Sequence, residues 1–145
     1  MRKKEPSNFT APSPRRFTLP KSHILRGRRN FQQLFESRKF INTPTISVRF
    51  AVYSSNKEGF KVGFISPKKI GNAVQRNRYK RLMREAYRLN KHTLSEAMNN
   101  FEGSLHVVCI ARHTKPDYHA IENDMVTLLG DLRSRILSAN KSEEF

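Results

Sequence analysis

Three things are scarce in this sequence: cysteine, acidic residues and long apolar runs. Only one of the 145 residues is cysteine, which excludes an internal disulfide and fits a reducing cytoplasm. That residue, Cys109, lies in the apolar run 107–110, so we expect a buried, inert thiol. No run reaches the ~18 apolar residues of a membrane helix, and the N-terminus lacks the apolar segment of a secretory signal. The sequence thus predicts a cytoplasmic protein with no membrane partner.

Basic residues far outnumber the few acids. The chain has 28 Lys and Arg against 12 Asp and Glu, a net charge of +16. Residues 1–30 hold nine basic residues and one acid, and residues 61–91 hold ten and one, whereas residues 92–145 hold five and eight. Such self-repulsion adds nothing to fold stability, and its usual cause is a polyanionic partner. A charge that served solubility alone would be spread more evenly.

The distribution of proline and apolar residues divides the chain into three parts. Residues 1–21 combine four prolines with basic residues, a composition typical of a disordered basic arm. Residues 22–138 carry the periodic apolar patterns of one folded domain, and residues 139–145 are expected to fray.

Apolar spacing within the domain predicts an alternation of helices and strands. Helices are expected at 30–37 (with Asn30 as N-cap), 73–90 and 117–138, with an ambiguous short helix within 92–102. Strands are expected at 39–42, 46–53, 60–65 and 105–111. The last strand is continuously apolar and should be central, and the short connection between 46–53 and 60–65 favours their antiparallel pairing. The order α-β-β-β-α-β-α is typical of an α+β fold with helices on one side of a mixed sheet.

Residues 68–85 are the most informative stretch, because basic side chains recur there at helical spacing. On a helix at about 100° per residue, an arc of roughly 140° collects Arg76, Asn77, Lys80, Arg81, Arg84 and Arg88. Arg78 lies at the border, and the opposite arc collects Tyr79, Leu82, Met83, Ala86 and Leu89. Like charges four residues apart destabilise a helix by a few tenths of a kcal/mol per pair, so their repetition indicates a phosphate-bearing partner.

The string Lys69-Ile70-Gly71-Asn72-Ala73-Val74, followed by Arg76-Asn77-Arg78-x-Lys80-Arg81-x-x-Arg84-Glu85, closely resembles the signature of the bacterial ribonuclease P protein family. The resemblance extends from about Ser22 to Leu132. It implies a fold like the second domain of ribosomal protein S5, and a role as protein subunit of the endoribonuclease that removes the 5′ leader of precursor tRNA. By resemblance, contacts to the catalytic RNA subunit fall on Lys68, Lys69, Arg76, Asn77, Arg78, Lys80, Arg81 and Arg84, and the helical arc adds Arg88.

The resemblance also implies a cleft between the first helix and the sheet that holds the single-stranded leader. Its aromatic positions match Phe31, Phe35 and Phe50, on which unpaired bases could stack. From the residues alone, two Phe four positions apart on a short helix fit a core-facing stripe equally well, because Phe is usually buried. Core and cleft both remain open for these three rings.

Catalytic side chains are not evident in the basic stretch. Residues 61–91 hold a single acid, Glu85, and the chain has no His or Cys pairing at metal-ligand spacing. We therefore expect neither catalytic nor metal-binding residues in the protein. By resemblance, the RNA subunit binds Mg2+ and cleaves, while the protein broadens substrate use and lowers the Mg2+ demand. Three other classes fit the charge: a ribosomal or ribosome-assembly RNA-binding protein of similar fold, a DNA-coating protein, and a metal-dependent nuclease.

Overall fold

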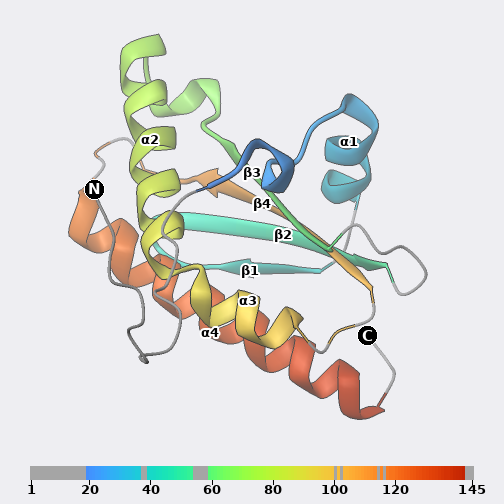
Figure 1. The fold of residues 1–145 in the computed structure, drawn as a ribbon. Helices are drawn as coiled ribbons and strands as arrows, with labels where there is room; N and C mark the ends of the chain where they lie inside the picture. The colour runs from blue at the N-terminus through green and yellow to red at the C-terminus, as the bar shows by residue number, and fades with distance from the viewer. Residues whose placement is uncertain are drawn as a thin grey trace, which may run out of the picture.

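The computed structural model of the chain describes residues 19–36, 39–53, 59–99, 101, 103–113, 115 and 117–142. Residues 1–18 of the predicted arm and residues 143–145 of the predicted tail lie outside the described residues. The elements, in chain order, are η1 (Lys21–His23), α1 (Arg28–Glu36), β1 (Phe40–Asn42), β2 (Ile46–Tyr53), β3 (Gly59–Ile65), η2 (Lys68–Ile70), α2 (Ala73–Asn90), α3 (His92–Met98), β4 (Ser104–Ala111) and α4 (Tyr118–Ser142) (Figure 1). The α-β-β-β-α-β-α order is confirmed, and the ambiguous stretch after α2 forms the short helix α3.

The ends of two helices differ from the prediction. Helix α1 starts at Arg28, just after Gly27, whose φ of 97° favours glycine. Asn30 therefore lies inside the helix, where its side-chain amide donates to the carbonyl oxygen of Arg26 at 2.7 Å, and its assignment as N-cap is wrong. Helix α4 continues to Ser142, past the expected end near Ser138.

The four strands form one mixed sheet in the order β1-β2-β4-β3. The predicted antiparallel pairing of 46–53 with 60–65 is wrong, because β4 lies between those strands. Val107 of β4 faces Phe50 on the antiparallel side and Val62 on the parallel side. A parallel pair needs a long crossover, and α2 with α3 provide it between β3 and β4. The prediction that 105–111 is central is confirmed, because β4 is buried along nearly its whole length.

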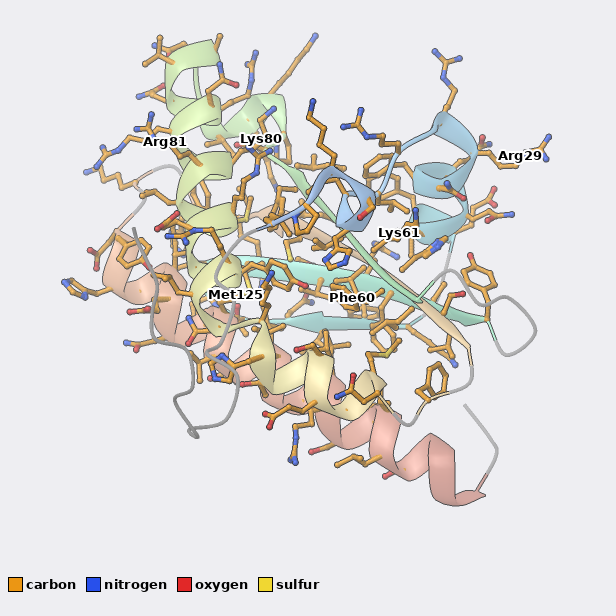
Figure 2. The ribbon with its side chains drawn as sticks, in the orientation of Figure 1. Arg29, Phe60, Lys61, Lys80, Arg81 and Met125 are labelled. Atoms are coloured by element: carbon orange, nitrogen blue, oxygen red, sulfur yellow. The ribbon has the colours of Figure 1, made fainter. Side chains whose placement is uncertain are left out.

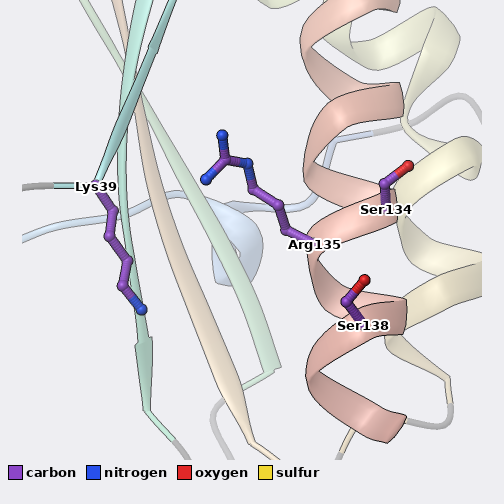
Figure 3. A pocket seen from close by; sticks show the side chains of 4 residues that line it. All are labelled: Lys39, Ser134, Arg135 and Ser138. Carbon is purple, nitrogen blue, oxygen red and sulfur yellow. The ribbon is translucent and has the colours of Figure 1, made fainter. Parts of the chain in front are cut away.

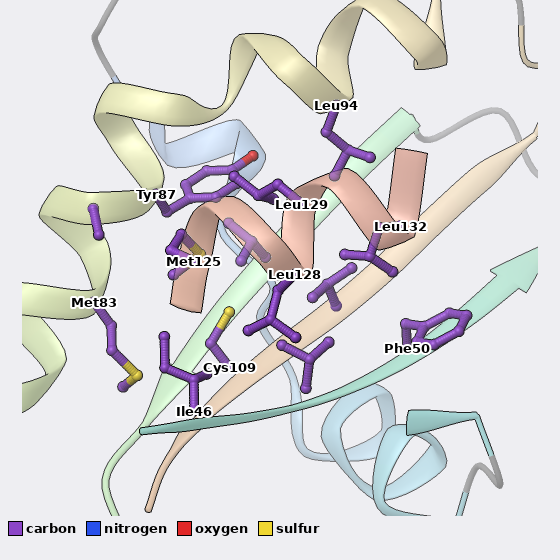
Figure 4. Packing of buried hydrophobic residues seen from close by; sticks show 14 of the residues in the cluster. Ile46, Phe50, Met83, Tyr87, Leu94, Cys109, Met125, Leu128, Leu129 and Leu132 are labelled. Atoms are coloured by element: carbon purple, nitrogen blue, oxygen red, sulfur yellow. The ribbon is translucent and has the colours of Figure 1, made fainter. Parts of the chain in front are cut away.

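The main core lies between one face of the sheet and α2, α3 and α4 (Figure 4). Alternation along β2 sends Ile46, Val48 and Phe50 to this face, where each is at most 1% exposed. In the predicted helix 117–138, five apolar positions that recur at helical spacing are all buried: Ile121, Met125, Leu128, Leu132 and Ile136. Their spacing of three and four residues gives the helix one continuous apolar stripe.

Helix α1 lies on the other face of the sheet, against a smaller cluster. Leu34 of α1 is fully buried there beside Leu25 and Val108. The expectation that the helices lie on one side is therefore wrong for α1. The physical reason is that the inner residues of β4 are apolar on both faces, so both faces must be covered. In Figure 1, α1 and α4 lie on opposite sides of the strands.

Candidate RNA interface

Helix α2 starts from a tightly built turn. The Asn72 side chain accepts a hydrogen bond from the Gln75 backbone N–H at 2.9 Å, and the Gln75 side chain accepts one from the Asn72 N–H at 2.8 Å. This capping box satisfies two backbone donors that the first turn of a helix leaves unpaired. Gly71 precedes it with φ of 149°, and a Cβ there would lie 2.1 Å from the Gln75 side-chain oxygen. The turn therefore requires glycine at this position.

The inner face of α2 is fixed by packing and by one buried hydrogen bond. Tyr79 and Met83 are fully buried, and Tyr87 stacks on Phe60 of β3 with ring centroids 5.7 Å apart. The Tyr79 hydroxyl donates to the carbonyl oxygen of Thr45 at 2.6 Å. Of the five predicted inward positions, Tyr79, Met83 and Ala86 are buried, whereas Leu82 and Leu89 are only half-buried. These contacts determine which side of the helix faces solvent.

The outward face of α2 carries Asn77, Arg78, Arg81 and Arg84, all of them exposed. Within the described part of the chain, none of these three arginines forms an ion pair, and Arg84 lies over the Phe64 ring at 5.8 Å. Lys68 and Lys69 of η2 are exposed just before the helix. We call Lys68, Lys69, Arg78, Arg81 and Arg84 the cationic face. It is free to neutralise the phosphates of a partner.

The cationic face is rotated from its predicted centre. Arg76 and Lys80, which were expected on its ridge, are half-buried along its flank. One guanidinium nitrogen of Arg76 donates to the carbonyl oxygen of Gly71 at 2.9 Å, so this side chain also closes the turn before the helix. Arg78, which was expected at the border, is exposed. The burial of Tyr87 explains this rotation, because it turns the inner face of α2 toward Arg76 and Lys80. Figure 2 shows Lys80 and Arg81 on different sides of α2.

Arg88, which the helical arc added to the predicted RNA contacts, differs from the arginines of the cationic face because it is paired within the protein. Its side chain forms an ion pair with Glu85, with the Nε–H donating to a carboxylate oxygen at 3.1 Å and one terminal nitrogen donating to the other. This hydrogen bonding holds the pKa of the Glu85 carboxyl below its usual value. Glu85 thus neutralises the positive charge of Arg88 within the protein, and the Arg88 side chain is half-buried.

Two aromatic rings of α1 are placed differently. Phe31 is half-buried and packs against the sheet at Gly63, where a Cβ would lie 2.8 Å from the ring. Phe35, one turn later, is 46% exposed. An open cavity of about 420 Å3 adjoins both rings and is lined by Arg28, Phe31, Gln32, Phe35 and Glu36. The helix therefore offers one exposed ring and the edge of a second to a ligand.

Phe50 does not face this cavity, and its predicted place in the cleft is wrong. Its side chain is fully buried in the main core, on the opposite face of the sheet from α1. The alternation of β2 explains this, because Ala51, the next residue, is the one that packs beside α1. Figure 4 shows the Phe50 ring in the main cluster.

The sequence analysis missed an aromatic residue at the edge of the sheet. Phe40 of β1 is 50% exposed, and the Arg49 guanidinium lies 5.7 Å from its ring centroid. Arg49 also donates to the carbonyl oxygen of Phe35 at 3.4 Å, which connects this pair to the end of α1. The cross-strand pairing of Phe40 with Arg49 could have revealed this site. It depends, however, on the register of β1 and β2, which the sequence does not specify.

The described ranges contain neither a metal-binding cluster nor a helix suited to a membrane. No three His, Cys, Asp or Glu side chains there come close enough together to hold a metal ion. None of the helices in these ranges has the length and apolarity needed to cross a bilayer.

The fold and the surface together define a class: a small basic α+β protein that presents a cluster of exposed cations on one face of α2 and the turn before it. The sequence model of the family described as Ribonuclease P matches residues 19–133, which cover both the sheet and the cationic face. The chain belongs to the ribonuclease P protein family.

Curated relatives and solved structures agree with this assignment. The chain is 39% identical over 99 residues to the ribonuclease P protein component of Syntrophus aciditrophicus, covering 68% of this chain and 75% of that protein. It is 32% identical over 117 residues to the counterpart from Citrifermentans bemidjiense, covering 81% and 94%. The fold matches the RNase P protein of Thermotoga maritima with a TM-score of 0.59 and 25% identity, covering 74% of this chain and 96% of that one. The Staphylococcus aureus RNase P protein matches in fold with a TM-score of 0.61, 24% identity and coverage of 77% and 96%.

Proposed function

We propose that this chain is the protein subunit of a cytoplasmic ribonucleoprotein that cuts precursor tRNA endonucleolytically and so releases its 5′ leader. The observation that carries the proposal is the cationic face of α2. Its arginines are exposed and make no ion pair within the described ranges, while Tyr79 and Met83 hold the back of the same helix in the core. An RNA strand that docks there meets side chains carried by a helix whose backbone is already fixed, so little backbone entropy is lost on binding.

The cationic face acts on the catalytic RNA subunit. Guanidinium groups of Arg78, Arg81 and Arg84 bind backbone phosphates in pairs of hydrogen bonds and displace condensed counterions. Lys68 and Lys69 extend this contact as point charges before the helix. By neutralising phosphates where two RNAs approach each other, the protein takes over part of the work that Mg2+ otherwise does, and the assembly needs less of it.

Hydrolysis is assigned to the RNA subunit, with the Mg2+ that it binds. Glu85 is the only acid between residues 61 and 91, and its pairing with Arg88 lowers its pKa. A carboxylate with a lowered pKa is a weaker proton acceptor, which makes Glu85 a poor general base. The protein therefore contributes binding and orientation, and no catalytic residue.

The single-stranded leader is assigned to the cavity on α1. Phe35 offers an exposed ring, Phe31 adds the edge of a second, and Arg28 supplies charge for the backbone. Stacking of an unpaired base on an aromatic ring contributes about 1–3 kcal/mol and tolerates different bases. This tolerance suits a subunit that must accept many precursors.

Reconstitution tests the proposal. The full chain is mixed with the catalytic RNA subunit and a precursor tRNA at limiting Mg2+, and the release of the leader is measured. We expect the wild-type protein to stimulate cleavage strongly. The Arg81→Gln variant should stimulate less, whereas the matched control Arg133→Gln, which removes an equal charge from exposed α4, should behave as wild type. Wild-type protein that leaves the rate unchanged would refute the proposal.

A further inference from the structure

A second cluster of basic and hydroxyl side chains lies at the far end of α4 from the cationic face. The chain before β1 and the second half of α4 border an open cavity of about 310 Å3, lined by Lys39, Ser134, Arg135 and Ser138 (Figure 3). Arg135 packs over Phe50, which places the cavity on the α4 side of the sheet, away from α1. Neither the aromatic rings of α1 nor the arginines of α2 line it.

The guanidinium group of Arg135 is held in place on two sides. Its central carbon lies 5.4 Å from the centroid of the buried Phe50 ring, and its Nε–H donates to Asp131 at 3.0 Å. Both contacts leave the outer edge of the guanidinium group unused, because its two terminal nitrogens donate to no other described residue. Figure 3 shows this side chain extending from α4 toward the sheet. The guanidinium group of Arg135 therefore offers the cavity two N–H donor groups in one plane, and its orientation is already fixed.

The other lining groups favour an anion. Lys39 and Arg135 bring two positive charges to the cavity, and Asp131 forms an ion pair with Arg135. Burial and the nearby Arg135 lower the pKa of Lys39, so the two cations destabilise each other in the absence of a ligand. The hydroxyls of Ser134 and Ser138 add groups that can donate to oxygen. Two cations and two hydroxyls along one cavity suit a ligand that carries several anionic oxygens, such as a phosphate.

We propose that this cavity binds a backbone phosphate of an RNA strand, as a second anchoring point separate from the cationic face. Tyr118, at the start of α4, lies near Glu85 and Arg88 of α2, and Arg135 follows it by 17 residues, or ~25 Å along the helix axis. One phosphate cannot touch both places, so the strand bound here is a different segment of RNA. The choice of RNA as the source of the phosphate rests on the function proposed above.

Nuclear magnetic resonance of the full chain tests the site directly. The amides of Ser134 and Ser138 and the side-chain Nε–H of Arg135 are followed during addition of inorganic phosphate, of a short oligouridylate, or of chloride at equal ionic strength. We expect saturable shifts with phosphate and with the oligonucleotide, and none with chloride. Lys39→Gln should weaken the binding roughly ten- to a hundredfold, as expected for one lost charged hydrogen bond.

Two variants separate the site from general electrostatics. Arg135→Gln should abolish the shifts, but it also uncovers Phe50, so Lys39→Gln is the decisive variant because it leaves that contact in place. Arg133→Gln removes the same charge from an exposed position of the same helix and should bind like wild type. Equal weakening by Lys39→Gln and Arg133→Gln, or shifts that rise without saturation, would overturn the proposal.

The remaining outcomes also distinguish the two proposals. Saturation with inorganic phosphate but not with oligouridylate would overturn the assignment to RNA and identify a site for a free phosphate compound. Absence of saturable binding, with normal stimulation of the catalytic RNA, would overturn this inference alone. Saturable binding without any stimulation would overturn the proposed function and keep the phosphate site.

Discussion

The hydroxyl of Tyr79 donates a 2.6 Å hydrogen bond to the carbonyl oxygen of Thr45, and this bond ties α2 to the turn between β1 and β2. The same turn is bound to α4, because Asp124 accepts hydrogen bonds from the backbone N–H and the hydroxyl of Thr45 at 2.8 and 2.6 Å. Tyr79 stands between Arg78 and Lys80 in the sequence. The bond therefore sets the rotation of α2, and with it the direction of the cationic face.

Removing that hydroxyl should cost stability. We expect Tyr79→Phe to lower the free energy of unfolding by about 1 kcal/mol, a typical net value for one buried hydrogen bond. The Thr45 carbonyl keeps its bond from the backbone N–H of Arg112 at 3.1 Å, which limits the loss. Urea denaturation measures the change. Tyr118→Phe is the control, because its hydroxyl lies 3.5 Å from Glu122 in a partly exposed place, and equal losses would contradict the argument.

The same substitution at two glycines should have opposite effects. Gly71→Ala places a side chain at φ of 149° and against Gln75 of the capping box, so we expect a loss of about 1–3 kcal/mol. Gly130→Ala lies within α4 with no heavy atom within 4 Å of the new Cβ, and should add about 0.5–1 kcal/mol. Thermal unfolding of both variants decides the question. A neutral Gly71→Ala would show that the turn before α2 is not constrained.

Much of the local structure could be predicted because it follows from periodicity alone. The bounds of α2 agree with the prediction, since Asn72 marks its start and apolar residues recur on one side of it. The buried residues of α4 also follow from helical spacing, because its apolar residues recur every three or four positions. The strand predicted at 105–111 from its continuous apolar residues is central, because only such a strand tolerates burial on both faces.

The sequence did not predict which strands pair or which helices cover each face of the sheet, because both depend on parts of the chain that are far apart in sequence. Proximity in sequence favoured a β2–β3 hairpin, yet β4 lies between these strands. The alternation of β2 places Phe50 on the same face as Ile46 and Val48, but it does not show which helices cover that face. The ion pair of Arg88 with Glu85 could not be predicted either, because a helical wheel shows the angular position of a side chain and not its partner.

The ion pair of Arg88 leads to a prediction about salt dependence. Arg81→Gln should reduce the slope of log affinity against log salt, measured with the catalytic RNA subunit, by about 0.7–0.9 for the lost phosphate contact. Arg88→Gln removes a charge already matched by Glu85, so its slope should stay close to that of wild type. Filter binding over a range of potassium chloride concentrations measures both. Equal slopes for the two variants would place Arg88 in the interface after all.

Cys109 should be unreactive in the native protein. Burial raises the pKa of this thiol to about 12, so almost none of it is thiolate near neutral pH. Because the thiolate is the attacking species, and the side chain is only 2% exposed, alkylation by iodoacetamide should require unfolding. Mass spectrometry should find modified Cys109 in denaturant and none in native buffer. Rapid native modification would show that β4 opens readily.

Two phenylalanines on opposite faces of the sheet should respond differently to truncation. Phe50→Ala empties a fully buried position and should lower the free energy of unfolding by about 3–5 kcal/mol. Phe35→Ala removes a ring that is 46% exposed, so we expect less than about 1 kcal/mol of instability, together with weaker binding of a precursor with a single-stranded leader. Mature tRNA, which has no leader, is the control ligand and should bind Phe35→Ala and wild-type holoenzyme alike. If both ligands bind equally less well to the Phe35→Ala holoenzyme, the cavity on α1 has a role other than holding the leader.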